Sequence, residues 1–249
     1  MMPNPYFLTR MTWPEVEQAL KTVKIAIIPL GAHEQHGPHM VESCDAVLAE
    51  EMGKRLTERL YPEAILTPVI NMGVSPHHLH FPGTISLEPA TVIAILRDMI
   101  KSLKRHGIEQ FLILNAHGGN QATLGVAADQ LTGELDVRIY YAKTTASAKD
   151  VMDRRLESKL YGHSCEREVS EALYLAPHLV RADKLEAADY REGRWKKLRP
   201  GNPLQGFYYY DEMTGNGCIG DATKASEEIG KEIVETALER LAKAVQEVI

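Results

Sequence analysis

The stretch Val23-Lys-Ile-Ala-Ile-Ile-Pro-Leu-Gly31-Ala-His-Glu-Gln-His-Gly-Pro-His39 decides the fold, because an apolar run leads directly into a polar cluster. Residues 23–30 are rich in Val and Ile and end at a glycine, which is typical of a buried β-strand. The polar residues that follow then lie at the carboxyl end of that strand. The next question is whether the rest of the sequence supplies neighbours for such a strand.

Strand and helix patterns alternate along the first 141 residues. Thr12, Pro14 and Glu15 predict the start of a first helix, since Thr and Glu form a capping box and proline suits the first turn. This alternation predicts βαβ units, a mostly parallel sheet, and helices on both of its faces. Further helices are expected over 45–60, 89–106 and from 120 to 131, and further strands over 64–70, 110–115 and 137–141.

The second half of the sequence has a mainly helical pattern. A loop rich in Gly, Pro and Tyr is expected over 190–220, and the segment 222–249 has the pattern of an amphipathic helix. No linker, repeat or low-complexity tract divides the chain, so we expect one α/β domain over residues 1–249. The apolar stripe of the last helix, which indicates core packing, is Ile229, Ile233, Leu238, Leu241 and Val245.

The composition is that of an ordinary globular protein, with 44% apolar and 25% charged residues. A chain of this size can form a core without metal or disulfide help, so any metal is expected to be functional. The net charge of −6 argues against nucleic acid or an anionic membrane as the partner. The basic residues within 191–199 are expected to form a solvated loop.

The cysteines and the N-terminal sequence indicate the cellular location that is expected for the protein. Cys44, Cys165 and Cys218 are widely spaced and form no C-x-x-C pair, which excludes a disulfide framework or zinc knuckle and suits a reducing compartment. Residues 1–14 lack the apolar core of a signal peptide, and no apolar run reaches the roughly 18 residues of a membrane span. The expected location is cytoplasmic.

Two polar clusters follow predicted strands, where ligands bind in open parallel sheets. In the first, Glu34 and His36 are two residues apart, so in an extended segment both side chains face one pocket. Asp45 follows at an expected helix start, where a carboxylate can also serve as a cap. In the second, His117 lies beside two glycines, which allow close approach of a ligand to the backbone. Its sequence is neither G-x-G-x-x-G nor a Walker motif, so a nucleotide site is only weakly indicated.

Histidines and carboxylates gather in two further places. His163 and Glu168 are five apart around an expected helix start, and six of the ten histidines lie within 33–39 and 77–80. Such side chains suit Zn²⁺, Mn²⁺ or Fe²⁺, and a carboxylate that bridges two ions is typical of two-metal hydrolytic sites. On spacing alone, a metal site and a set of solvated histidines both remain open.

Taken together, these motifs resemble the creatininase, or creatinine amidohydrolase, family. The resemblance implies a creatininase-like α/β fold, a metal-dependent hydrolase with a pair of divalent ions (Zn, Mn or Fe), a small-molecule substrate, and a homo-oligomer, often a hexamer. The matching stretches occur in the family's order: residues 29–39 with Asp45, Phe81-Pro-Gly-Thr84, Asn115-Ala-His-Gly-Gly-Asn120, His163 with Glu168, and Gly217-Cys-Ile-Gly-Asp221.

The resemblance also implies the metal ligands. Glu34 and His117 would bind one ion, His36 would bind the other, and Asp45 would bridge them. Creatininase itself has Tyr and Glu in place of the two glycines after the histidine, and that Glu is a ligand. This sequence has Gly119 there, so the second ion lacks one expected ligand.

Glu168 is the predicted replacement for this ligand, with Glu166 a weaker candidate and water a third. His163 corresponds to the family's proton-transferring histidine, and Glu168 would orient it if it is not itself a ligand. A water activated between the two ions would attack a carbonyl carbon, and His163 would pass a proton to the leaving nitrogen. The predicted substrate-binding residues are His78, Thr84, Gly118, Gly119 and Asn120.

Creatinine itself is disfavoured as the substrate. Creatininase carries tryptophans in a loop before its catalytic histidine, whereas this sequence has only Trp13 and Trp195, and none over 144–163. Tyr161 and the tyrosines at 208–210 can supply aromatic surface instead, although packing or a subunit contact is favoured for them.

Three functions remain open at this point. The first is hydrolysis of a small cyclic amide or a formamide. The second is hydrolysis of a peptide, or of a C–C bond in a cyclic ketone, with the same metal site. The third is metal binding without catalysis, against which the His163–Glu168 pair argues, since storage needs no proton shuttle.

Overall fold

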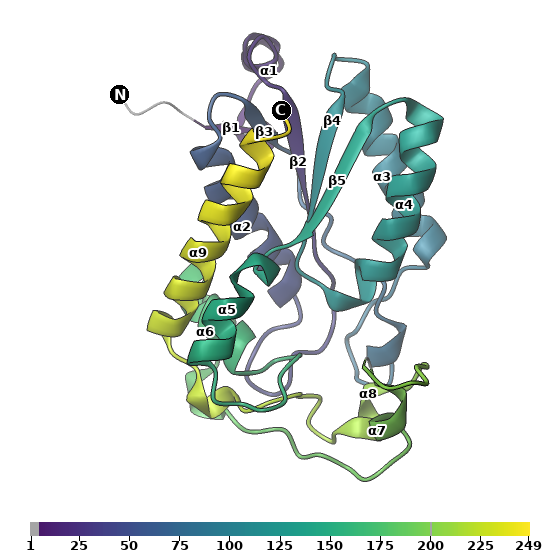
Figure 1. The fold of residues 1–249 in the computed structure, drawn as a ribbon, viewed down its shortest axis with the longest axis vertical. Coiled ribbons are helices and arrows are strands. Elements are labelled where there is room, and N and C mark those ends of the chain that lie inside the picture. Colours follow the sequence, from purple (N-terminus) through teal and green to yellow (C-terminus); the bar gives the residue numbers. More distant parts are fainter. Residues whose placement is uncertain (1–4, 200) are drawn as a thin grey trace.

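The computed structural model describes residues 5–199 and 201–249; residues 1–4, part of the N-terminal segment considered above, and Pro200 in the expected loop lie outside the described residues. In the described part, the centre is a five-stranded, all-parallel sheet of order β1-β3-β2-β4-β5 (Figure 1). The predicted α/β class with a parallel sheet is therefore confirmed. The strands are β1 (Tyr6–Phe7), β2 (Ile25–Leu30), β3 (Ala64–Leu66), β4 (Gln110–Asn115) and β5 (Arg138–Lys143).

Helices cover both faces of the sheet, as predicted (Figure 1). Ile25 and Ile27 of β2 pack into the core on one face, and Ala26 and Ile28 pack into the core on the other. Because β2 is buried on both sides, its sequence is a continuous apolar run rather than an alternating one. The helices are α2 (Cys44–Arg59) and α9 (Glu227–Gln246) on the first face, and α3 (Pro89–Lys104) and α4 (Gln121–Leu135) on the second.

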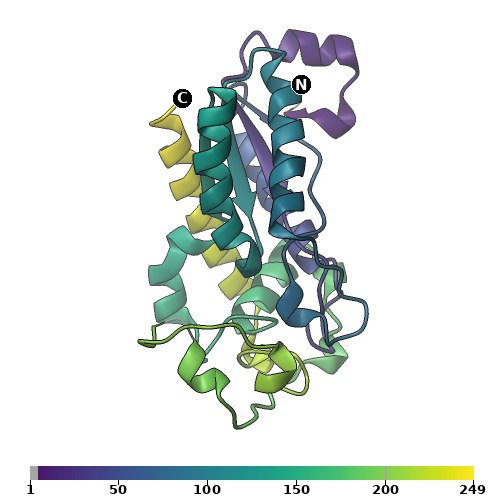
Figure 2. The ribbon, with the colours of Figure 1, turned by 90° about the vertical axis from the view of Figure 1, so that its right-hand side faces the viewer.

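Not all the remaining helices lie beyond the sheet, since Val151 of α5 (Lys149–Arg155) and Val169 of α6 (Glu166–Leu175) pack into the core of the first face. The capping box of α1 (Trp13–Ala19) is confirmed, with the backbone N–H of Thr12 donating to Glu15 Oε2 at 2.6 Å. The segment after α6 crosses the carboxyl ends of the strands, at the opposite end from α1 (Figures 1 and 2). No helix among the described residues has the length and apolarity needed to span a membrane. The other helices are α7 (Trp195–Leu198) and α8 (Tyr210–Met213).

Apart from shifts of a few residues at element ends, the structure differs from the sequence-based expectation in four short elements. The strand predicted over 64–70 ends at Leu66, because Pro68 has no N–H to continue the ladder. The edge strand β1 has two residues, too few to show a period. The predicted loop over 190–220 contains α7 and α8, which have four residues each and are equally short of a periodic pattern. None of these differences touches the two central strands.

The two central strands define where a ligand can bind. The chain leaves β2 toward β3 on one side and then crosses to β4 on the other, so the strand order reverses between β2 and β4. Leu30 pairs with Asn115, which places the ends of the two strands level. The loops that begin at Gly31 and Ala116 therefore diverge from one point, the usual place for a ligand in an open parallel sheet.

Candidate metal centre

Four acidic and imidazole side chains converge at this switch point. Glu34 and His36 come from the loop after β2, Asp45 from the first turn of α2, and His117 from the loop after β4. His36 Nε2 lies 3.3 Å from Asp45 Oδ1. His117 Nδ1 lies 3.2 Å from Glu34 Oε1 and 3.1 Å from Asp45 Oδ2. All four side chains are buried, so the structure brings together the residues that the resemblance names as ligands.

Each of the two histidines turns one nitrogen toward this centre and uses the other on the backbone. His36 Nδ1 donates to the carbonyl of Glu34 at 3.0 Å, and His117 Nε2 donates to the carbonyl of Val74 at 3.0 Å. A carbonyl only accepts, so in the neutral rings the nitrogens that face the centre carry lone pairs. Metal-ligating histidines are held by this kind of second contact.

The centre is short of hydrogen-bond partners. Among the described residues, Glu34 Oε1 and Oε2, Asp45 Oδ2 and His36 Nε2 are buried without a hydrogen bond of good geometry. Unpaired buried carboxylates cost several kcal/mol each. Divalent cations held by these oxygens and nitrogens would satisfy all of them, so the donor set fits a metal site.

Without a cation, the neighbouring carboxylates hold protons on the imidazoles. Burial lowers the pKa of His36, but Asp45, Glu168 and Glu34 raise it, with a net result of about 9. Burial likewise lowers the pKa of His117, and Glu34 and Asp45 raise it well above its usual range. Burial raises the pKa of Asp45, whereas His36 and His117 hold it well below the usual range. A cation that binds here must therefore displace protons.

His163 and Glu168 flank the centre on the side of α6. His163 Nδ1 lies 3.6 Å from Glu34 Oε1. One carboxylate oxygen of Glu168 lies within 4.8 Å of ring nitrogens of both His36 and His163. Glu168 also accepts from Arg167 Nη2 at 2.7 Å, which shares its charge. Glu168 is thus within reach of a second ion.

Glu166 has a different task. Its carboxylate accepts hydrogen bonds from the backbone N–H of Glu157 at 3.1 Å and of Ser158 at 3.0 Å. It therefore holds the loop before α6, and it belongs to none of the groups of side chains that are close enough to share an ion among the described residues.

Gly119 stands where creatininase has a ligating glutamate. A Cβ built at Gly119 would lie 2.2 Å from the carbonyl oxygen of Val74 and 2.4 Å from His117 Nε2. A Cβ at Gly118 would meet nothing within 4 Å. The loop after β4 therefore has no room for a side chain at the family's ligand position, and a replacement ligand has to come from another element.

A cavity of about 240 Å³ opens beside the centre. Three of the predicted substrate-binding residues, His78, Gly118 and Gly119, line it together with His163. Tyr210 lines it too, and its ring centroid lies 4.0 Å from that of His78. The sequence pattern favours packing for the tyrosines at 208–210, and nothing in the spacing of that loop shows that Tyr210 reaches the site.

The other two predicted substrate-binding residues, Thr84 and Asn120, do not line this cavity. Thr84 Oγ1 accepts from the backbone N–H of Gln35 at 3.1 Å. Asn120 donates to the carbonyl of Gly31 at 3.0 Å and accepts from the N–H of Val74 at 2.9 Å. Because their polar atoms are engaged with the backbone, these side chains tie the loops of the site to one another.

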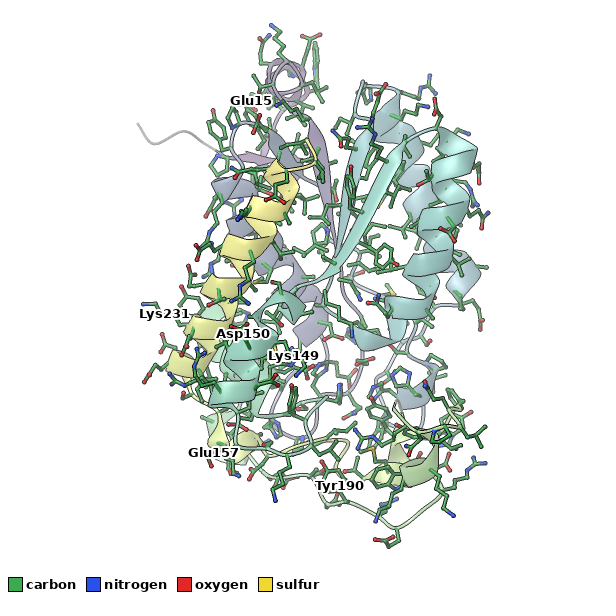
Figure 3. The ribbon with its side chains drawn as sticks, in the orientation of Figure 1. Glu15, Lys149, Asp150, Glu157, Tyr190 and Lys231 are labelled. Atoms are coloured by element: carbon green, nitrogen blue, oxygen red, sulfur yellow. The ribbon has the colours of Figure 1, made fainter. Side chains whose placement is uncertain are left out.

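A second cavity, of about 320 Å³, adjoins the first and shares Glu168 with it. Tyr161 and Lys143 line it, and Lys143 forms no ion pair with any described residue. Lys149, labelled on α5 in Figure 3, also lines this cavity but pairs with Asp153 at 2.5 Å. The space next to the centre thus continues into a larger chamber at the end of β5.

A buried set of carboxylates and imidazoles at the switch point of a parallel sheet, with a cavity beside it, is the arrangement of a metal-dependent hydrolase. Comparison with known proteins specifies the class. The sequence profile of the creatininase (creatinine amidohydrolase) family matches residues 9–245. The chain belongs to the creatininase family.

Several relatives align over most of their length. Creatinine amidohydrolase of Pseudomonas putida is 27% identical, over 99% of this chain and 98% of that protein. The mycofactocin precursor peptide peptidase of Mycobacterium ulcerans (strain Agy99) is 27% identical, over 93% and 86%. The 3-dehydro-scyllo-inosose hydrolase of Thermotoga maritima is 25% identical, over 99% and 85%. A solved structure described as creatininase Mn superposes with a TM-score of 0.84 at 27% identity, with 98% of each chain covered.

Proposed function

We propose that this protein is an amidohydrolase that cleaves the C–N bond of a small cyclic amide or a formamide. One observation carries the proposal: buried oxygens of Glu34 and Asp45, without a good hydrogen bond within the described part of the chain, lie beside a cavity that His78 and His163 also line. The proposed ligands are Glu34 and His117 for one ion, His36 and Glu168 for the other, and Asp45 for both.

A pair of Zn²⁺, Mn²⁺ or Fe²⁺ ions bound here would supply Lewis acidity and lower the pKa of water so that it ionises near neutral pH. His163 does the proton work. Its Nε2 donates to the carbonyl of Gln35 at 2.7 Å, which leaves Nδ1 free to accept a proton from the attacking water. The same nitrogen then gives the proton to the leaving nitrogen of the amide. Glu168 also accepts a hydrogen bond from the backbone N–H of Ser164 at 2.5 Å, which ties its carboxylate to the residues just before α6.

The size of the cavities supports a small substrate. Pockets for drug-sized ligands measure roughly 300–1,000 Å³, so the cavity of about 240 Å³ suits a small ring or a formyl group. The adjoining chamber, with Lys143 at its wall, suits a polar extension of such a molecule.

Two other functions follow from specific observations. Relatives named a peptide peptidase and an inosose hydrolase support a peptide, or a C–C bond in a cyclic ketone, as the second candidate. Metal binding without catalysis is the candidate from a different class. We further propose one domain over residues 1–249 and a cytoplasmic homo-oligomer, hexameric as in many members of the family. The free state of Cys44, Cys165 and Cys218 supports a reducing location.

The proposal is tested by metal analysis and a substrate screen on Asp45→Ala, with Asp98→Ala as the matched control. Asp98 lies exposed on α3, far from the site. The screen covers lactams, cyclic ureides, formamides, short peptides and cyclic diketones. We expect Asp45→Ala to lose both metal and activity, and Asp98→Ala to keep both. Full metal and full activity in Asp45→Ala would rule the proposal out.

A further inference from the structure

We propose that His78 is the hydrogen-bond donor of this site and not one of its metal ligands, and that Gln35 fixes it in that state. This inference rests on the proposed function, because the donor acts on the carbonyl oxygen of the substrate. Neither residue belongs to the proposed ligand set. Three hydrogen bonds of the buried Gln35 side-chain amide determine the state of His78.

The amide of Gln35 has its orientation set by two backbone groups. Gln35 Oε1 accepts from the N–H of Gly37 at 2.8 Å, and Gln35 Nε2 donates to the carbonyl of Gly217 at 3.0 Å. If the amide were flipped, its NH₂ group would face the N–H of Gly37 and its oxygen would face the carbonyl of Gly217. Only the observed orientation therefore satisfies both partners. In that orientation the second hydrogen of Nε2 is directed at His78 Nδ1, 2.8 Å away.

This contact determines which nitrogen of His78 carries the hydrogen. Because His78 Nδ1 accepts from Gln35, the neutral ring has its hydrogen on Nε2. His78 Nε2 is buried, lies 3.4 Å from Glu34 Oε1, and has no good hydrogen-bond partner among the described residues. Proximity alone would allow Glu34, His78 and His163 to share an ion. A nitrogen that carries a hydrogen has no lone pair for a metal, so His78 offers a donor instead.

His163 has the same tautomer, also fixed by Gln35, but it turns the opposite nitrogen toward Glu34. Its Nε2 donates to the backbone carbonyl of Gln35, so its Nδ1 bears the lone pair. The ring centroids of His78 and His163 are 4.4 Å apart. Through its side chain and its backbone, Gln35 therefore makes one histidine a donor and its neighbour an acceptor.

The two histidines therefore have different roles in amide hydrolysis, because His78 presents a hydrogen and His163 presents a lone pair. The oxygen of water bonds to the carbonyl carbon, and the proton that it loses goes to His163 Nδ1. As the C–N bond breaks, the leaving nitrogen takes that proton. His78 keeps its own hydrogen throughout and stabilises the negative charge that develops on the carbonyl oxygen. His78 is thus a catalytic residue, and Gln35 is a positioning residue.

Gly217, which is distant from Gln35 in the sequence, supplies the carbonyl that the Gln35 amide binds. It has a φ of +79°, and a Cβ at this position would lie 2.1 Å from Gln35 Oε1. The crossing segment can therefore bring its carbonyl to the amide only with a glycine here.

The test reads the tautomers directly. Zinc-loaded protein with ¹⁵N-labelled histidine is compared by long-range ¹H–¹⁵N correlation in wild type, His78→Ala and Gln35→Glu, with His178→Asn as an exposed control. We expect wild-type His78 to carry its hydrogen on Nε2. Gln35→Glu replaces the donor with an acceptor, so the hydrogen should move to Nδ1. His178→Asn should change neither tautomer.

Metal content and kinetics complete the test. We expect His78→Ala to keep its full zinc content and to lose about 10²–10³ in kcat, the range for removal of one oxyanion donor. A zinc-bound His78 Nε2, or loss of zinc in His78→Ala, would overturn the proposal. Should Gln35→Glu fail to fold, the wild-type tautomer still decides. If the protein hydrolyses no amide but His78 has the expected tautomer, the proposed function is wrong. The assignment of the hydrogen to His78 Nε2 would still hold.

Discussion

The cavity has two walls of different origin. The strand-end wall (residues 31–45 and 116–120) follows β2 and β4, and the register of these strands places it. The crossing wall (residues 157–199 and 201–221) supplies His163, Glu168 and Tyr210, and it reaches the site through long-range contacts such as that between Gln35 and Gly217. We infer that the strand-end wall supplies all the proposed metal ligands except Glu168, and that the crossing wall supplies Glu168, transfers protons through His163 and shapes the cavity. Four predictions test that division.

The largest expected effect is the difference in metal content between a histidine variant of the strand-end wall and a histidine variant of the crossing wall. His117→Ala removes a ligand from the strand-end wall, so metal and activity should be lost together. His163→Ala removes the proton carrier, so the metal should stay while kcat falls by about 10²–10⁴. Metal analysis and steady-state kinetics on the same preparations measure both. Equal metal loss in the two variants would erase the distinction between the walls.

The next effect uses the two adjacent glycines of the strand-end wall. Gly119→Ala forces His117 and the Val74 carbonyl apart, which we expect to cost about 1–3 kcal/mol of unfolding free energy and to weaken metal binding. Gly118→Ala faces open space and should stay within about 0.5 kcal/mol of wild type. Denaturant unfolding and metal titration give both values. A Gly119→Ala protein as stable as Gly118→Ala would show that the loop yields easily.

The metal-free strand-end wall should also respond to pH. The pKa of His36 is raised from 6.5 to about 9, so the folded state binds a proton that the unfolded state releases between these values. The stability from this group is fully present below pH 6.5 and is lost as the pH rises to about 9, at up to about 1.4 kcal/mol per pH unit. Thermal melts of chelator-treated protein should show this decline. Metal-loaded protein should not show it, and metal-free His36→Asn should show a smaller decline, because the raised pKa of His117 still contributes. A metal-free Tm that rises over this range would contradict the account.

The smallest effect lies in the crossing wall. Tyr210→Phe removes one hydroxyl from the lining of the cavity, which should change KM by about fivefold or less and leave metal content unchanged. Kinetics with the best substrate of the screen measure it. Loss of metal in this variant would move Tyr210 into the centre.

The same division explains what the sequence could predict. Glu34, His36, Asp45 and His117 follow strands with a clear apolar pattern, so their convergence follows from the parallel order of β2 and β4. The bounds of β4 agree with the predicted 110–115. The local pattern places these residues after strands, and the resemblance to the creatininase family names them as ligands; the register of β2 and β4 is what brings them together.

The roles of several other residues around the cavity, from both walls and from the loop after β3, were harder to predict from the sequence, for a physical reason. The roles of Gln35 and Tyr210 depend on partners that are far away in the sequence, and no local period encodes such contacts. The short helices α7 and α8 have too few residues for a pattern. Thr84 and Asn120 belong to recognisable motifs, yet their side chains bind backbone rather than line the cavity.

The central claim is a two-metal centre in which Glu168 replaces the ligand that Gly119 cannot supply. Its most direct test is the metal content per chain of protein purified without chelator, in wild type and Glu168→Ala in parallel. We predict a pair of divalent ions per wild-type chain and a single ion per Glu168→Ala chain, both determined by elemental analysis. A pair of ions per chain in both proteins would show that Glu168 is not a ligand and would leave it the role of orienting His163. No metal in wild type, even after incubation with Zn²⁺, Mn²⁺ or Fe²⁺, would contradict the account.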